Sequence, residues 1–214
     1  MQYLIDTFVP IAGPFIEHVQ LTLIALAIAL VIAVPLSVLL ARVRWLRGPV
    51  LGVLGVIYTI PSLSLLVLMI PLFGIGTTPA IIALVAYAQL VLVRNMVVGL
   101  TGLDPAILEA ARGMGMNSWQ RFRQVELPLA LPLILAGVRL ATLSIIAIAT
   151  VAALVGAGGL GTPLLIGVTT GDTRKIVAGS IAVALLAFGA NAILRLLERR
   201  AALAIRGEEQ AAGA

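Results

Sequence analysis

Five stretches of the chain are apolar and long enough to cross a membrane. They cover residues 19–41, 50–73, 79–93 extending to about 100, 132–155 and 176–194, and charges, prolines and glycines separate them. A helix needs about 20 apolar residues to cross the hydrocarbon core of a bilayer. Only a helix satisfies its own backbone in lipid, and no stretch alternates like a barrel strand. The sequence therefore predicts an all-α membrane protein with five transmembrane helices.

Composition excludes most other classes of protein. The chain has 214 residues, 61% hydrophobic and only 11% charged, with a mean hydropathy of +1.16, which lies far outside the range of soluble domains. Five spans leave no room for a soluble catalytic or nucleic-acid-binding domain. Cysteine is absent and His18 is the only histidine, so neither a disulfide framework nor a Cys or His metal site is expected. We predict no catalytic residue, no metal site and no nucleic-acid partner.

Basic residues set the expected orientation, because cytoplasmic loops collect Lys and Arg. All but two of the 14 basic residues fall after the first, third and fifth stretches or at the start of the fourth. The exceptions are Arg174 and Lys175. We expect the N-terminus outside and the C-terminus in the cytoplasm, with an extracytoplasmic segment (1–18), one transmembrane domain (19–200) and a tail (201–214) against membrane lipid. The first eighteen residues carry no Lys or Arg, so the first span, rather than a cleavable signal peptide, is expected to direct insertion.

A polar insert at residues 103–128, LDPAILEAARGMGMNSWQRFRQVELP, interrupts this apolar chain. Asp104 followed by proline is a helix-start pair, and Gly113 and Gly115 are expected to end that helix. A second start signal at Asn117 predicts another short helix before the fourth span. Such an insert either lies in the lipid headgroups as an amphipathic connector or docks onto a partner.

The order of residues in this insert favours docking. It reads EAA, three residues, G, nine residues, V, one residue, LP. This resembles the EAA signature of ABC importer permeases, with Val125 in place of isoleucine as the one departure. In that family the insert is a coupling helix that docks on a separate ATPase subunit, and the fold is that of a type I importer permease. The resemblance implies an ATPase-coupling set at Glu109, Ala110, Ala111, Gly113, Gly115, Leu127 and Pro128.

The resemblance extends over residues 60–95, 103–139 and 155–161, which are similar to permeases of osmoprotectant importers for glycine betaine, carnitine and choline. It implies a bacterial or archaeal plasma-membrane protein that is not an enzyme. The implied partners are an ABC ATPase dimer, a second permease copy or paralogue, and an extracytoplasmic substrate-binding protein. No G-x-x-x-x-G-K-[ST] motif occurs, so ATP and Mg²⁺ are expected on the ATPase and no cofactor on this chain. Methionine importer permeases share the five-span layout and a similar GAGGLG, and they stay as an alternative.

Two further features are candidates for the translocation path. The GAGGLG segment satisfies G-x-G-x-x-G, but a membrane span rather than a strand precedes it, so a turn at the outer end of the fourth span is expected instead of a dinucleotide site. Two tyrosines within spans either present ring faces to a quaternary ammonium or are packing residues. The possible path set comprises Tyr58, Tyr87, Gly156, Gly158, Gly159 and Gly161.

An ion-coupled secondary carrier is the alternative from a different class. Its usual mark is an ionisable residue buried in a span, yet no acid occurs from 19 to 93. Arg94 and Arg139 are the only charges expected within spans, and both are expected to reach toward the cytoplasmic interface. A carrier is therefore disfavoured, although sodium held by backbone carbonyls would leave no such mark.

Overall fold

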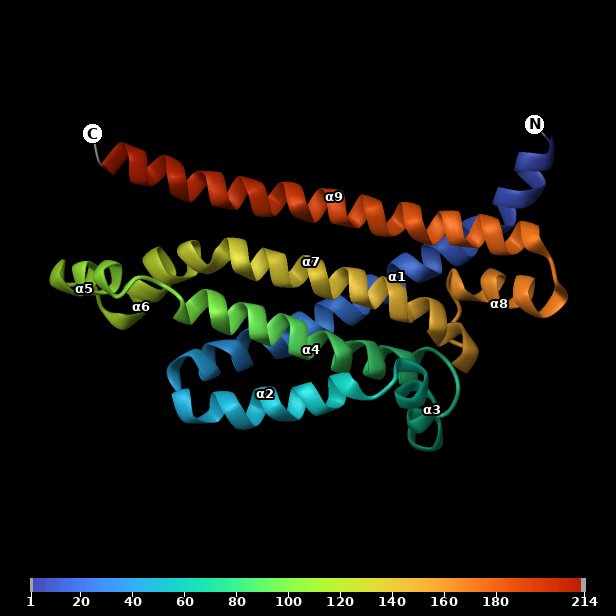
Figure 1. The fold of residues 1–214 in the computed structure, drawn as a ribbon, viewed down its shortest axis with the longest axis horizontal. Coiled ribbons are helices and arrows are strands. Elements are labelled where there is room, and N and C mark those ends of the chain that lie inside the picture. Colours follow the sequence, from blue (N-terminus) through green and yellow to red (C-terminus); the bar gives the residue numbers. More distant parts are fainter. Residues whose placement is uncertain (1, 213–214) are drawn as a thin grey trace.

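Helices make up nearly all of the part of the chain that the structure describes (Figure 1). The computed structural model describes the backbone of residues 2–212 and the side chains of residues 11–203. The elements in chain order are α1 (Gln2–Arg42), α2 (Arg44–Thr59), α3 (Ser62–Phe73), α4 (Thr77–Thr101), α5 (Pro105–Gly113), α6 (Ser118–Arg121), the π-helical turn η1 (Phe122–Glu126), α7 (Leu127–Val151), the 3₁₀ turn η2 (Ala152–Val155), α8 (Gly161–Thr170) and α9 (Thr173–Ala212). No strand occurs within residues 2–212, which confirms the predicted all-α class.

Four of the described helical segments are long and apolar enough to cross a membrane alone. They are Ile11–Arg42, Thr77–Thr101, Ser118–Val155 and Thr173–Leu203. The fifth predicted span, 50–73, is not one helix, because α2 and α3 meet at an angle of 96°. Ile60 has extended backbone (φ −64°, ψ 128°), as expected for a residue before proline, and Pro61 then begins the turn into α3. The 16 residues of α2 rise about 24 Å, less than the roughly 30 Å hydrocarbon core, so the crossings number four, or five if α2 and α3 count as one bent span. The number of five spans stays a prediction.

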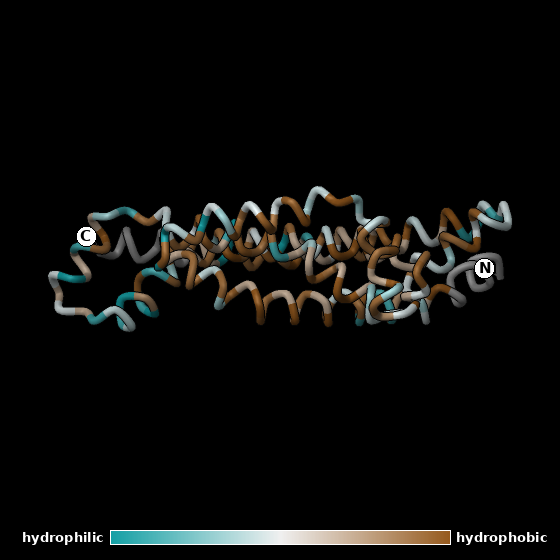
Figure 2. The backbone as a smooth tube through the Cα atoms, turned by 90° about the horizontal axis from the view of Figure 1, so that it is seen from below, coloured by the Kyte–Doolittle hydropathy of each residue, from teal (hydrophilic) through white to brown (hydrophobic). Residues whose placement is uncertain are grey.

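The elements that carry most of the basic residues share one end of the molecule. In Figure 1, α5, α6 and the end of α9 lie at the left, whereas α3 and α8 lie at the right. Figure 2 shows hydrophobic positions along most of the length, with hydrophilic positions at both ends, including the end that holds α5 and α6. The clustering of the basic elements at one end agrees with the charge pattern behind the expected orientation, and which end faces the cytoplasm stays a prediction.

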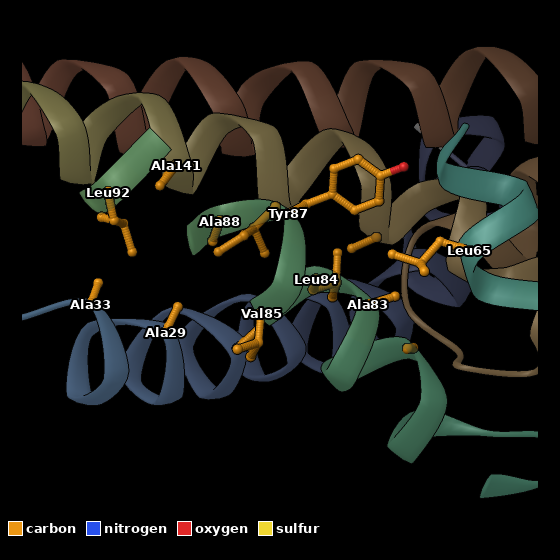
Figure 3. Packing of buried hydrophobic residues seen from close by; sticks show 14 of the residues in the cluster. Ala29, Ala33, Leu65, Ala83, Leu84, Val85, Tyr87, Ala88, Leu92 and Ala141 are labelled. Atoms are coloured by element: carbon orange, nitrogen blue, oxygen red, sulfur yellow. The ribbon is translucent and has the colours of Figure 1, made fainter. Parts of the chain in front are cut away.

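Small residues let the central helices approach closely. Ala25, Ala29 and Ala33 follow one another at four-residue spacing along α1 and are fully buried. Figure 3 shows Ala29 and Ala33 facing α4. On the other side of α4, a Cβ added to Gly137 of α7 would lie 2.6 Å from the Cβ of Asn95. Helix pairs in membranes gain stability from such close packing, so α4 forms the centre of the core.

A short helix, α8, was not predicted. Its ten residues are too few to span a bilayer and fall between the expected fourth and fifth spans. It packs against α9, where a Cβ on Gly167 would lie 2.8 Å from Ile176 Cγ1 and a Cβ on Gly179 would lie 2.9 Å from Leu164 Cγ. The helix therefore packs beside the glycine-rich segment, at the end of the bundle opposite α5.

Candidate functional site

Helix α5 projects beyond the end of the bundle and is built by the predicted signals (Figure 1). Asp104 Oδ1 accepts a hydrogen bond from the Ala106 N–H at 2.8 Å, and Pro105 occupies the first turn. Gly113 is the last helical residue, and Gly115 turns the chain with a φ of +80°. The first half of the insert therefore agrees with the sequence prediction.

The exposed surface of α5 is partly apolar. Glu109 and Ala110 are exposed, and so are Ile107 and, just beyond the helix, Met114, which is 70% exposed. Ala111 is only 1% exposed, so this alanine of the predicted coupling set packs inward. The exposed face of α5 thus carries small and apolar side chains, and no other element in the described part of the chain covers it. A helix that docks on a partner requires such a face.

The second half of the insert differs from the prediction. Asn117 does cap α6, with a reciprocal capping box to Gln120, but α6 does not stop before the fourth span. It passes through η1 directly into α7, where the Leu127 N–H donates to the Phe122 carbonyl in an i→i+5 bond. Pro128 has no N–H to donate, and a wider π turn before it accommodates that loss. Leu127 and Pro128 of the coupling set therefore lie at a rigid junction between the insert and a transmembrane helix.

Side-chain contacts hold this junction against the end of α1. Arg121 Nε lies 2.7 Å from Glu126 Oε1 across the π turn. The Phe122 ring stacks on Trp119 with centroids 6.0 Å apart, and the Arg42 guanidinium lies 5.7 Å from the Phe122 centroid. A displacement of the insert would therefore be passed to α7 and α1.

At the opposite end, the GAGGLG segment makes the predicted turn. Gly156, Gly158 and Gly159 all have positive φ, at +78°, +79° and +71° respectively. Gly161 differs, because its φ is not positive. Glycine is required there for steric reasons, since a Cβ would lie 2.0 Å from the Thr150 carbonyl oxygen. The segment therefore folds back tightly on the end of α7.

Two adjacent residues of α1 bind this glycine segment, which sequence reasoning missed. Glu17 Oε2 accepts the Gly159 N–H at 3.0 Å. The fully buried His18 ring accepts the Leu160 N–H at Nδ1, 3.2 Å away, and its Nε2 lies 3.2 Å from the Ile146 carbonyl oxygen. Because a carbonyl only accepts, Nε2 carries the proton and the ring is neutral. The only sequence signal was the presence of the sole histidine in an apolar stretch.

A cavity of about 380 Å³ opens beside this contact. Glu17 and Gln20 of α1, Thr77 at the start of α4, and Gly156 and Gly158 are among its lining residues. Gly159 and Gly161 of the predicted path set do not line it. The structure thus brings two of the four predicted glycines to a cavity of mixed polar and apolar lining, at the end of the bundle opposite α5.

The two tyrosines of the path set lie together but differ in exposure. Their rings meet edge to face, with centroids 5.7 Å apart and an interplanar angle of 65°. Tyr87 is 5% exposed and its hydroxyl donates to the Ile60 carbonyl at the break between α2 and α3. Tyr58 is 41% exposed. Tyr87 is accordingly buried in the packing of the bundle, and of the two tyrosines only Tyr58 has an exposed ring.

The two arginines within spans also differ. Arg139 of α7 is paired with α9: its Nε lies 2.9 Å from Glu198 Oε2 and its guanidinium donates to Asn191 Oδ1 at 3.3 Å. That it reaches toward the cytoplasmic interface stays a prediction. Arg94 of α4 is exposed and has no ion pair or hydrogen bond with the side chains described for residues 11–203.

Comparison with known proteins places these features in a family. Residues 33–203 match the family described as "Binding-protein-dependent transport system inner membrane component". The osmoprotectant import permease protein OsmW of Salmonella typhimurium is 42% identical over 203 residues, which cover 92% of this chain and 94% of that protein. The glycine betaine/carnitine/choline transport system permease protein OpuCB of Bacillus subtilis is 40% identical, over 86% of this chain and 85% of its own length.

Solved structures agree on the fold. An inward-facing MetNI methionine ABC transporter matches with a TM-score of 0.81 and 24% identity, over 94% of this chain and 99% of that chain. An amino acid ABC transporter crystallised with histidines matches with a TM-score of 0.76 and 20% identity, over 92% of this chain and 96% of that one. At these identities the similarity shows the fold alone, and it confirms the predicted type I importer permease fold.

Proposed function

The chain belongs to the family of binding-protein-dependent transport system inner membrane components, and from that premise we propose that it is the permease subunit of an ATP-driven importer for a quaternary-amine osmoprotectant. Members of this family are multi-pass transport components of a membrane and not enzymes. Glycine betaine, choline and carnitine are the proposed substrates, because these compounds appear in the names of relatives that are about 40% identical.

The exposed face of α5 is the observation that supports energy coupling. A nine-residue helix that carries Glu109 and Ala110 outward and has Met114 uncovered beside it needs a partner surface. We assign that partner as an ABC ATPase dimer, which binds ATP and Mg²⁺ in place of this chain. Glu109, Ala110, Gly113 and Gly115 form the proposed contact surface, while Ala111 packs behind it.

Transport requires more than one copy of this fold. Five crossings are too few to enclose a path. We therefore propose that a second permease copy or paralogue packs against a membrane-embedded face of this chain. An extracytoplasmic binding protein is proposed to deliver substrate at the end that holds α3, α8 and the glycine segment.

Coupling in this proposal is mechanical. ATP binding closes the ATPase dimer and draws two α5 helices together, and alternating access follows from this movement. The helical continuity from α6 through η1 into α7 passes the displacement into the membrane, and Arg42 on Phe122 passes it to α1. The binding energy of ATP thereby drives the change between outward and inward access.

Reconstitution into liposomes tests the proposal. The chain is co-purified with its ATPase and binding protein, and uptake of labelled glycine betaine, choline, carnitine and methionine is measured with and without internal ATP. ATP-dependent uptake of a quaternary amine supports the proposal. Uptake of methionine alone would favour the alternative, a methionine importer permease. Uptake that an ion gradient drives without ATP would overturn the importer mechanism.

A matched pair of variants tests the contact surface. Glu109→Ala removes an exposed carboxylate from α5 and should lower ATP-dependent uptake, whereas Glu208→Ala, in the tail beyond the family match, should leave uptake unchanged. Equal uptake by Glu109→Ala and the native chain would remove Glu109 from the coupling set.

A further inference from the structure

A second cavity lies between α2, α4 and α7, away from the outer end. Tyr58 of α2, Arg94 and Asn95 of α4, and Leu140 of α7 are among its lining residues, and its volume is about 360 Å³. That volume lies within the range of small-molecule sites. No Asp or Glu lines the cavity, which offers one aromatic ring, one positive charge and the Asn95 amide on otherwise apolar walls.

Arg94 lies well inside its span. Seven residues, about 10 Å of helix rise, separate it from Thr101 at the end of α4. A charge at such a position is costly, and in membrane proteins it faces a bundle interior, another subunit or water rather than lipid. The exposed face of α4 around Arg94 is therefore a face toward a path or a second permease.

Arg139 provides an internal comparison. It also lies within a span, but Glu198 and Asn191 on α9 neutralise and orient its guanidinium. Arg94 has no comparable carboxylate among the side chains of residues 11–203. A ligand that brings its own negative charge would supply the missing counter-charge. Guanidinium groups bind carboxylates with two parallel hydrogen bonds, which makes a carboxylate a fitting counter-charge.

Tyr58 supplies the complementary group in the same cavity. Its ring is held edge to face by Tyr87, whose hydroxyl is itself fixed on the Ile60 carbonyl, so the exposed face of Tyr58 is pre-oriented. A quaternary ammonium is attracted to such a ring face. A cation without a carboxylate would meet the same ring but would be repelled by Arg94.

We infer that this cavity is a transient binding site on the translocation path, and that it favours zwitterions with a carboxylate and a quaternary ammonium over simple quaternary cations. Arg94 binds the carboxylate and Tyr58 binds the ammonium. This inference rests on the proposed function, since it names the charge class that the permease itself favours.

Uptake into liposomes by the full complex tests the assignment of Arg94. Glycine betaine, a zwitterion, and choline, a cation, are each supplied at concentrations that saturate the binding protein, and the ratio of their ATP-dependent uptake rates is measured. Arg94→Gln should lower the betaine to choline ratio at least roughly tenfold, because a charge-assisted pair is lost for one substrate only. The ratio does not depend on how much complex is folded.

The tyrosine gives a second, independent arm. Tyr58→Leu removes the ring and should lower uptake of both compounds, whereas Tyr58→Phe keeps the ring face and should lower neither. Because Tyr58 is exposed, these variants test the site even if Arg94→Gln fails to assemble.

Two results would overturn the inference while the proposed function stands. One is an active Arg94→Gln complex with the ratio of the native complex, and the other is native rates for both compounds in Tyr58→Leu. A native complex that transports no quaternary amine would instead overturn the proposed function, and this inference with it.

Discussion

His18 and Leu160 are hydrogen-bonded directly although 142 positions separate them in the chain: the ring Nδ1 accepts the Leu160 N–H at 3.2 Å. Glu17 makes a parallel contact to the preceding N–H, that of Gly159. The two bonds fix the N-terminal half of α1 to the segment that joins α7 to α8. Since Nε2 also reaches the Ile146 carbonyl, one buried ring ties α1 to both α7 and the glycine segment.

Replacing His18 by leucine should therefore destabilise the protein. The substitution introduces an apolar side chain that leaves the buried Leu160 N–H without its partner, and such an unsatisfied group costs about 1–3 kcal/mol. Thermal unfolding in mild detergent should move to lower temperature. The exposed neighbour Gln20 is the control, because Gln20→Leu removes no such bond. Equal midpoints for the two variants would mean that the ring contributes nothing to stability.

Local signals explain what the sequence could predict. Long apolar stretches determine helices in lipid whatever their neighbours are, and the Asp104 cap acts within its own turn. The all-α class and the short helix between Asp104 and Gly115 were accessible for this reason. The proposed coupling role of Glu109 was suggested by family resemblance, and it stays a prediction.

What could not be predicted depends on contacts between distant segments or on the degree of a bend. The stretch 50–73 was predicted as one span, yet the chain bends by 96° at Pro61, because the preceding residue Ile60 leaves the helical region. The pairing of Arg139 with Glu198, 59 positions away, was not predicted. The hydrophobic periodicity of the sequence does not predict contacts between such distant residues.

Gly115 should be sensitive to substitution for a purely conformational reason. A Cβ there would meet nothing within 4 Å, but the φ of +80° would cost a side chain about 1–2 kcal/mol. Gly115→Ala should shift α5 and lower ATP-dependent uptake while the complex stays folded. Gly189→Ala is the matched control, since its Cβ would also meet open space, its backbone is helical within α9, and it lies outside the proposed contact surface. The assignment fails if both variants transport alike.

The ion pair between Arg139 and Glu198 should stabilise the contact of α7 with α9. Both side chains are about a quarter exposed, at 25% and 27%, so the pair is partly screened. Arg139→Gln and Glu198→Gln should each lower the free energy of unfolding by about 1.5–3 kcal/mol. The double variant should lose less than the sum, because removing one partner already breaks the interaction. Strict additivity in unfolding measurements would show that the two groups are not coupled.

The orientation of the whole chain can be tested because the native sequence contains no cysteine. Ala110 on α5 and Val168 on α8 are exposed and lie near opposite ends of the molecule in Figure 1. Val168 is preferable to Gly158, whose φ of +79° would strain a cysteine. In intact cells, a membrane-impermeant maleimide should label Val168→Cys readily and Ala110→Cys only after permeabilisation. The reverse pattern would invert the orientation expected from the arginines, and labelling of both from outside would contradict an odd number of crossings between α5 and α8.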